Sequence, residues 1–304
     1  MIVNPVLAKE LRDRVRTWRS PLLITIYGSA LAGIGGLNYY FQTLYSYGGT
    51  QALRLGLMTF ATLAVVQLIL IAFLAPGMTA SIISGERERQ TWALLLVTRL
   101  SPLSIVVGKL LSAISYIVLL VLVSMPIYST VFLFGAVDMR NLLQIVLISL
   151  ATIVTIASIG LFCSALFKRT VTAIVISYMV TFFLFGGTVI SAGVIQSLNM
   201  EKWSRLNQTP PTPFIVNFCP LVALGSALPE GVNIIPFARP VQSTAVTMNG
   251  QTMLSQTVPA QAKPLVPRPV WQVNLILDAL IVLVCLGLTV WLIRPLRAGN
   301  KKGG

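Results

Sequence analysis

Histidine is absent from this chain, and cysteine and acidic residues are scarce. The 304 residues include three cysteines and eight Asp and Glu side chains, against 22 Lys and Arg. Zinc and haem sites rely largely on histidine and cysteine ligands, and Cys163, Cys219 and Cys285 are scattered along the sequence without a ligand-like spacing. We therefore predict no metal site, and the cysteine positions predict no disulfide framework.

Charged residues of both signs make up only 10% of the chain, whereas hydrophobic residues make up 56%. A soluble domain carries about 25% charged residues, so the lipid bilayer is the natural solvent for most of this sequence. Six apolar segments exceed the ~20 residues that a helix needs to cross the hydrocarbon core. They cover approximately residues 21–41, 55–81, 103–134, 142–167, 171–197 and 271–293. The sequence predicts an all-α integral membrane protein in which residues 1–304 form one transmembrane domain.

The basic residues between these spans predict the orientation of the chain. If both termini are cytoplasmic, 15 Lys and Arg lie on the inner side and 7 on the outer side, five of them in the long loop 198–270. Because long loops contribute little to the positive-inside rule, this bias predicts that both termini are cytoplasmic and that loop 198–270 is extracytoplasmic. The expected location is a prokaryotic cell (inner) membrane, which the chain crosses several times. The charges are divided among short segments, which disfavours binding to nucleic acid.

The N-terminal residues 4–20 show the pattern of an amphipathic helix. Apolar side chains recur at helical spacing, and basic side chains gather on the opposite face. Such a helix lies in the headgroup plane and contacts membrane lipid. The residues assigned to this membrane-surface helix are Lys9, Arg12, Arg16, Trp18 and Arg19.

The segment between the second and third spans contains a concentration of charge. Half of the eight acidic residues fall on the predicted cytoplasmic side, and Glu86 and Glu88 are two of these four. Carboxylates do not assist membrane insertion, so recognition by another protein is one explanation. In a helical arrangement, Trp92 and Leu95 belong to one apolar stripe. The alternative is a solvated loop whose arginines only hold the topology.

The order of residues in this segment resembles the ABC-2 type permease family, the membrane subunits of a large class of ABC transporters. The resemblance rests on Gly85–Thr91, a leucine run, and then Thr98–Pro102. It extends to Pro76, to the opening of the third span at Gly108–Leu110, and to the start of the chain at Asn4–Arg12. It covers residues 1–115 together with the six-span layout, whereas loop 198–270 and the last span resemble the family only in position.

The resemblance implies that segment 83–100 forms a coupling helix that docks into a separate ATPase subunit. The residues it assigns to this contact are Glu86, Arg87, Glu88, Arg89, Thr91, Trp92 and Leu95. ATP and Mg²⁺ would bind to the partner. The chain itself has no P-loop, since its only Gly-Lys pair, Gly108-Lys109, is followed by leucine. A cofactor-free, non-enzymatic permease subunit is therefore expected, working with a second copy or a paralogue.

Two functional hypotheses follow. The first is the permease subunit of an ATP-driven exporter. The second is a non-transporting membrane anchor or signalling subunit that recruits an ATPase to envelope machinery. An intramembrane hydrolase is disfavoured, because it needs a paired acid or base and Asp278 is the one carboxylate inside a span.

A few polar and small residues inside the spans are further candidates. Tyr27, Gln67 and Asp278 are assigned to a translocation path, with interhelical hydrogen bonds as the alternative role of the first two. Asp278 either binds a cationic group or pairs with an arginine such as Arg268; the alternative is a protonated or water-accessible aspartate near the outer surface. Glycines in the first and fifth spans allow close helix contact, and these spans are the predicted subunit interface. These glycines are Gly33, Gly35, Gly36, Gly186 and Gly187.

Overall fold

The structure is a computed structural model that describes most of the chain. The described residues are 18–44, 51–90, 102–132, 137–205, 213–229, 244–248, 251–255 and 270–298. Six helical runs within them are long and apolar enough to cross a membrane. The predicted all-α architecture with six spans is therefore confirmed.

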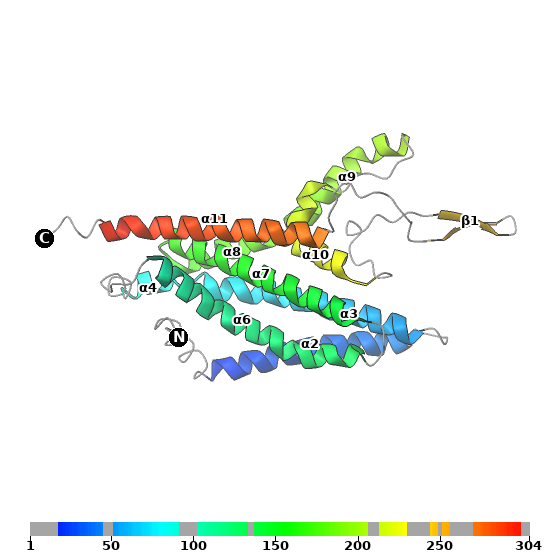
Figure 1. Cartoon of the computed structure of the whole chain (residues 1–304), viewed down its shortest axis with the longest axis horizontal. Helices are drawn as coiled ribbons and strands as arrows, with labels where there is room; N and C mark the ends of the chain where they lie inside the picture. Colours follow the sequence, from blue (N-terminus) through cyan, green and yellow to red (C-terminus); the bar gives the residue numbers. More distant parts are fainter. Residues whose placement is uncertain are drawn as a thin grey trace.

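The first four spans form an up-and-down bundle (Figure 1). They are α2 (Arg19–Leu44), α3 (Gln51–Thr79), α6 (Pro102–Phe132) and α7 (Met139–Leu166). α3 remains helical through its internal proline, Pro76. α7 lies at the centre of the molecule, where it packs against α3, α6, α8, α10 and α11. From Ile148 to Ala165 none of its side chains is exposed, whereas Leu143 and Leu147 are exposed nearer its start. Burial on all sides of this second half fits its almost uniformly apolar sequence.

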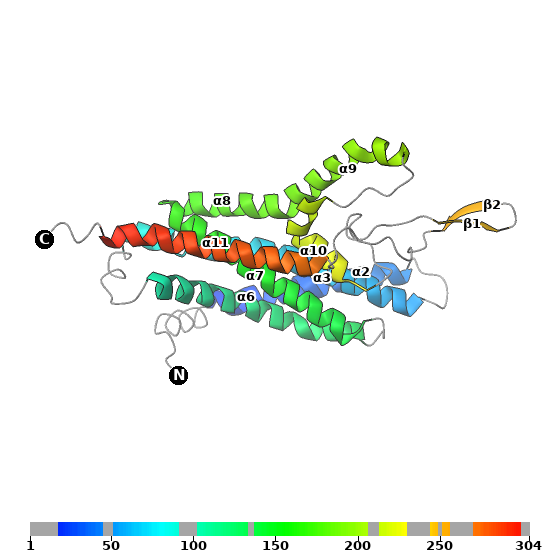
Figure 2. The same cartoon turned by 45° about the horizontal axis from the view of Figure 1, so that its top comes forward.

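The fifth span is interrupted near its middle. It consists of α8 (Thr170–Phe182), a π-helical turn at Phe183–Gly187, and α9 (Thr188–Arg205). A π turn changes the direction of a helix, and α9 diverges from the bundle in both Figure 1 and Figure 2. Helical structure continues beyond the predicted end of this span at residue 197.

The long loop contains short helices that return to the bundle. A 3₁₀ turn (Phe214–Phe218) and α10 (Pro220–Ala227) both pack against the last span, α11 (Val270–Ala298). Most of α10 is buried, and it also touches α3 and α7. The apolar first part of loop 198–270 thus closes one end of the bundle.

Further along the same loop, β1 (Thr244–Met248) and β2 (Gln251–Ser255) pair as an antiparallel hairpin. The hairpin projects from the bundle end to which α9 also points (Figure 2). We call this the α9 end. The opposite end, where α2 begins, α11 finishes and α4 lies (Figure 1), is called the α4 end.

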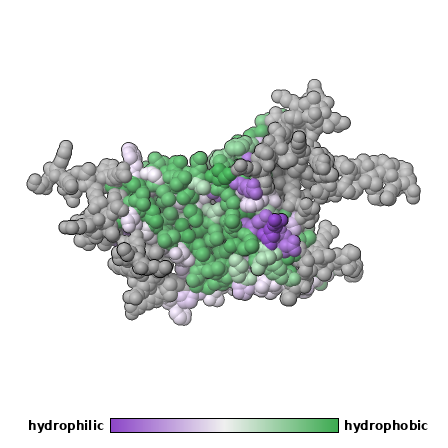
Figure 3. Space-filling model, in the orientation of Figure 1, coloured by the Kyte–Doolittle hydropathy of each residue, from purple (hydrophilic) through white to green (hydrophobic). Residues whose placement is uncertain are grey.

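Apolar side chains cover the middle of the bundle surface, as Figure 3 shows for one face. Exposed side chains in this belt include Leu122, Phe182, Leu283 and Trp291. A soluble protein rarely exposes so large an apolar area, whereas a bilayer accommodates it without cost. The surface therefore agrees with the membrane-spanning assignment of the helices.

Candidate coupling site

The segment after α3 folds back onto its own chain. It makes a turn and then a five-residue helix, α4 (Ser84–Glu88), at the α4 end of the bundle. Two residues after the end of α4, Gln90 has a φ of 58°, in the left-handed region that often follows a helix. Thr91, Trp92 and Leu95 of the predicted coupling helix lie outside the described residues.

A serine of α7 holds the start of α4. The backbone N–H groups of Ile83 and Ser84 both donate to Ser164 Oγ, at 2.8 and 2.9 Å. Ser164 Oγ in turn lies 3.2 Å from Ser84 Oγ. The first N–H groups of a helix have no partner within the helix, so Ser164 satisfies two buried donors that would otherwise be unpaired.

The charged residues of α4 reach the junction between α7 and α8. Arg87 Nη1 donates to the carbonyl oxygen of Ala165, near the end of α7, at 2.9 Å. Glu88 accepts two hydrogen bonds from Thr170, the first residue of α8: 2.8 Å from the backbone N–H and 2.7 Å from the hydroxyl. The carboxylate thus caps α8, where negative charge is favourable. These two hydrogen bonds from Thr170 lower the pKa of Glu88 below its usual value.

The remaining acidic residue of α4 contacts α6. Glu86 Oε1 lies 2.5 Å from Lys109 Nζ, and the lysine side chain is only 3% exposed, against 25% for the glutamate. A buried ammonium group requires a nearby negative charge, because its removal from water is costly. Lys109 therefore anchors α4 to the third span.

The contacts of α4 with four spans change the interpretation of the charged motif. Glu86, Arg87 and Glu88, assigned from the sequence to the ATPase contact, all bind groups of their own chain. The side chain of Arg89 is exposed at the end of α4. The sequence did not identify Ser164 or Thr170, because a hydroxyl in an apolar span gives no pattern that specifies its partner. Lys109 was visible as a charge inside a span, but its partner was not.

Replacing Ser164 by alanine is expected to weaken this junction. The change leaves the N–H groups of Ile83 and Ser84 buried without an acceptor, at about 1–3 kcal/mol. Ser158→Ala is the matched control, since Ser158 is buried on the same helix but donates only to Val154 of its own helix. Thermal unfolding in detergent should show a clearly lower midpoint for Ser164→Ala than for Ser158→Ala. Equal midpoints would contradict a structural role for these two bonds.

Most of the predicted membrane-surface helix cannot be placed, because Lys9, Arg12 and Arg16 lie outside the described residues. Of its other two residues, Trp18 has an 81% exposed side chain and Arg19 is the first residue of α2.

Tyr27 and Gln67 are buried within the chain, on α2 and α3. Ser124 Oγ of α6 lies 3.2 Å from Gln67 Oε1 and 2.6 Å from the Val121 carbonyl of its own helix, so Gln67 faces a hydroxyl of the neighbouring helix. Asp278 is buried at the contact between α7 and α11. The translocation role of these three residues stays a prediction.

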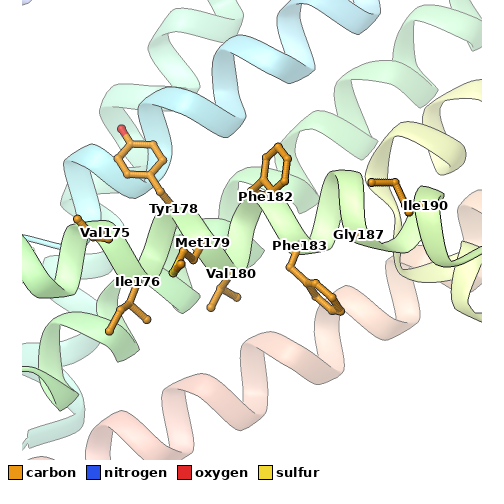
Figure 4. Close-up of a pocket in the computed structure, with 9 residues that line it drawn as sticks. All are labelled: Val175, Ile176, Tyr178, Met179, Val180, Phe182, Phe183, Gly187 and Ile190. Carbon is orange, nitrogen blue, oxygen red and sulfur yellow. The ribbon is translucent and has the colours of Figure 1, made fainter.

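The fifth span carries a surface hollow of about 870 Å³. Its lining is apolar apart from Tyr178, whose hydroxyl donates to the Phe73 carbonyl of α3 at 2.7 Å. Figure 4 shows Tyr178 and Phe182 pointing to one side of the span and Ile176 and Phe183 to the other. This open, apolar surface suits contact with lipid or with another apolar helix.

The sequence was also compared with known proteins. A family model described as "ABC-2 family transporter protein" matches residues 4–292. No curated protein matches the chain at a significant level.

Proposed function

Since the chain belongs to the ABC-2 transporter family, we propose that it is the permease subunit of an ATP-driven exporter, coupled to a separate ATPase subunit through segment 83–100. The family match covers nearly the whole chain, and six described helices can span a membrane. ATP and Mg²⁺ would be bound by the ATPase.

In this proposal the α4 end faces the cytoplasm of a prokaryotic cell, as do both termini. Arg89, Lys168 and Arg169 are exposed at that end, and Lys and Arg favour the cytoplasmic side. The ATPase would therefore approach α4 and the α7–α8 junction together.

The contacts of α4 are the observation that supports coupling most directly. α4 follows α3 in the chain and is bonded to α6 through Lys109, to α7 through Ser164 and Ala165, and to α8 through Thr170. A force applied to α4 by a moving partner would be transmitted to four spans at once. Rigid-body movements of this kind are a common basis of switching between states.

We further propose that a second copy or a paralogue packs against α2 and the fifth span. On α2, a Cβ placed at Gly33 or Gly36 would meet nothing within 4 Å, whereas one at Gly35 would meet Leu63 of α3. Gly33 and Gly36 are thus available for contact with another helix, and Gly35 serves the fold of this chain. A path for cargo would then run between the two subunits.

The test uses Arg89→Glu, because this side chain is exposed and its replacement leaves the internal bonds of α4 in place. The tagged chain is isolated from its native cells in mild detergent, and the co-purifying P-loop ATPase is quantified by mass spectrometry. Charge reversal at a contact costs several kcal/mol, so we expect at least about a tenfold loss of bound ATPase, equivalent to 1.4 kcal/mol. Arg140→Glu, exposed at the first turn of α7 on the opposite end, is the matched control.

The outcomes separate the hypotheses. An ATPase bound to the wild type and to Arg140→Glu, but not to Arg89→Glu, supports the proposal. Complete absence of an ATPase would contradict the permease function. Equal binding by both variants would contradict the location of the coupling site. A bound ATPase without ATP-dependent transport of any cargo in vesicles would favour the alternative, a non-transporting anchor.

A further inference from the structure

The contact between α7 and α11 contains a buried carboxylate. The two helices run in the same direction and are packed along much of their length (Figure 1). Ile148 lies close to Trp271, and two turns further along, Thr155 lies within hydrogen-bonding reach of Asp278. Asp278 therefore occupies a central position in this contact, facing α7 and not the lipid.

Within the described residues, two acceptor atoms at this position have no partner. Asp278 is 3% exposed, and its Oδ2 makes no hydrogen bond. One turn earlier on the same face of α11, Asn274 is fully buried. Its Nδ2 donates to the Asn217 carbonyl at 2.8 Å, which leaves its Oδ1 unpaired. Two buried oxygens without donors are unusual in a folded protein.

Thr155 has one hydroxyl hydrogen, and the Ala151 carbonyl oxygen of its own helix lies 3.0 Å from Thr155 Oγ1. When this hydrogen turns to Asp278 instead, it serves one carboxyl oxygen only. Asp278 Oδ2 is still without a donor among the described residues. The hydrogen that Oδ2 lacks is one that the carboxyl group itself can carry.

No described cation faces Asp278 from the elements packed against α11. The described titratable side chains on α6, α7 and α11 are Lys109, Tyr116, Tyr128, Arg140, Cys163 and Cys285, with none on α10 or the 3₁₀ turn.

Each of these groups lies elsewhere. Lys109 pairs with Glu86 at the α4 end. Tyr116 packs beside Tyr27, and Tyr128 against Phe60.

The remaining groups lie further along α7 and α11. At 1.5 Å per residue, Arg140 is about 22 Å from Thr155 along α7. The thiol-bearing residues are two turns away: Cys163 is about 12 Å from Thr155, and Cys285 about 10 Å from Asp278.

We propose that Asp278 is a proton-binding site, in which the buried carboxyl group keeps its proton at neutral pH. One proton then supplies the missing donor and removes a charge from the protein interior, where it is unfavourable. A metal cation fits less well, because hard cations take about six oxygen ligands, whereas the described side-chain oxygens near this position belong to Asp278, Thr155 and, one turn away, Asn274. This inference is independent of the proposed transport function.

Protonation of Asp278 then depends on whether water reaches the α7–α11 contact and on the pH. The proton is retained while the contact is closed and dry. It is released to water when α11 separates from α7 or when the pH is raised. At neutral pH the folded chain holds a proton on Asp278 that the unfolded chain has already lost. The free energy of unfolding should therefore fall as the pH rises towards and through neutrality. Asp278→Asn, which is neutral at all pH values, should lose this dependence.

The direct test is the infrared carbonyl band of a protonated carboxyl group. The chain has three aspartates, so Asp13→Asn/Asp138→Asn leaves Asp278 as the sole aspartate without altering it. This variant is made with aspartate ¹³C-labelled at the side-chain carboxyl, and its spectrum at neutral pH is compared with that of the unlabelled variant. We expect an isotope-shifted carboxylic acid band that disappears at high pH.

Two results would overturn the proposal. The first is an isotope-shifted carboxylate band without an acid band at neutral pH, which shows that Asp278 is ionised. The second is an acid band that is lost on adding Na⁺ or K⁺ at constant ionic strength, which would assign the site to a metal cation. Asp278→Asn provides the independent check, since the pH dependence of its thermal midpoint should be flatter than that of Asp138→Asn.

Discussion

Replacing Gly160 by alanine should markedly destabilise the protein, with a fall of roughly 5–10 °C in its thermal midpoint. Gly160 is the point where α7 crosses the end of α3. A Cβ at this position would overlap the hydroxyl oxygen of Thr79 and lie 3.0 Å from its Cβ and 3.3 Å from the backbone nitrogen of Ala80. The helices must separate to admit a methyl group, because backbone atoms cannot rotate away.

Two further variants test the cause of this effect. Gly287→Ala, on α11, adds the same methyl group where nothing lies within 4 Å, and should leave the midpoint unchanged or slightly raised. Thr79→Ala removes the overlapping oxygen, so the double variant Gly160→Ala/Thr79→Ala should recover part of the loss. Equal midpoints for Gly160→Ala and Gly287→Ala would show that α3 and α7 do not approach so closely at Gly160.

Replacing Glu86 by glutamine should cost about 3 kcal/mol, because it removes the negative charge beside a buried ammonium group. Lys109→Met should cost less. Methionine fills the space of the lysine stem, and the glutamate that remains is less deeply buried than the lysine, with 25% of its side chain exposed against 3%. The order of stability expected from thermal unfolding in detergent is wild type, then Lys109→Met, then Glu86→Gln.

The double variant Lys109→Met/Glu86→Gln should be more stable than Glu86→Gln alone, since no unpaired charge is then buried. A positive coupling in this double-mutant cycle measures the interaction of the two groups. Lys168→Met, at an exposed position of the α4 end, controls for the loss of a positive charge. Additive effects of the two changes would show that Glu86 and Lys109 do not act as a pair.

Glu86 and Glu88 hold parts of the fold together, so their replacement is a poor test of docking. Alanine at Glu86 and Glu88 together would release Lys109 and uncap α8, so a lost partner would not distinguish a docking defect from a folding defect. Arg89, with its exposed side chain, separates the two. In the proposed function, the bonds of Glu86, Arg87 and Glu88 to neighbouring helices hold α4 in place, while Arg89 and the residues that follow contact the ATPase.

The sequence could predict part of this site and not the rest. Its position followed from order along the chain, since the charged run lies between the second and third spans. The partners of Glu86 and Glu88 did not follow, because Lys109 and Thr170 belong to other helices. A sequence records the charge of a residue, but which of several nearby groups it binds depends on the angle and depth at which helices pack.

What the sequence determined by itself is the fold class and the six spans, because twenty apolar residues in succession have one stable arrangement in a bilayer, a helix with all backbone groups paired. The tertiary structure alone decided the direction of the fifth span after its π turn, the return of α10 into the bundle, and the bonds of Glu86, Arg87 and Glu88 to other helices of the chain. It also placed Asp278 against Thr155. The physical reason is that hydropathy specifies how strongly a segment avoids water, whereas packing between helices specifies which side chains meet.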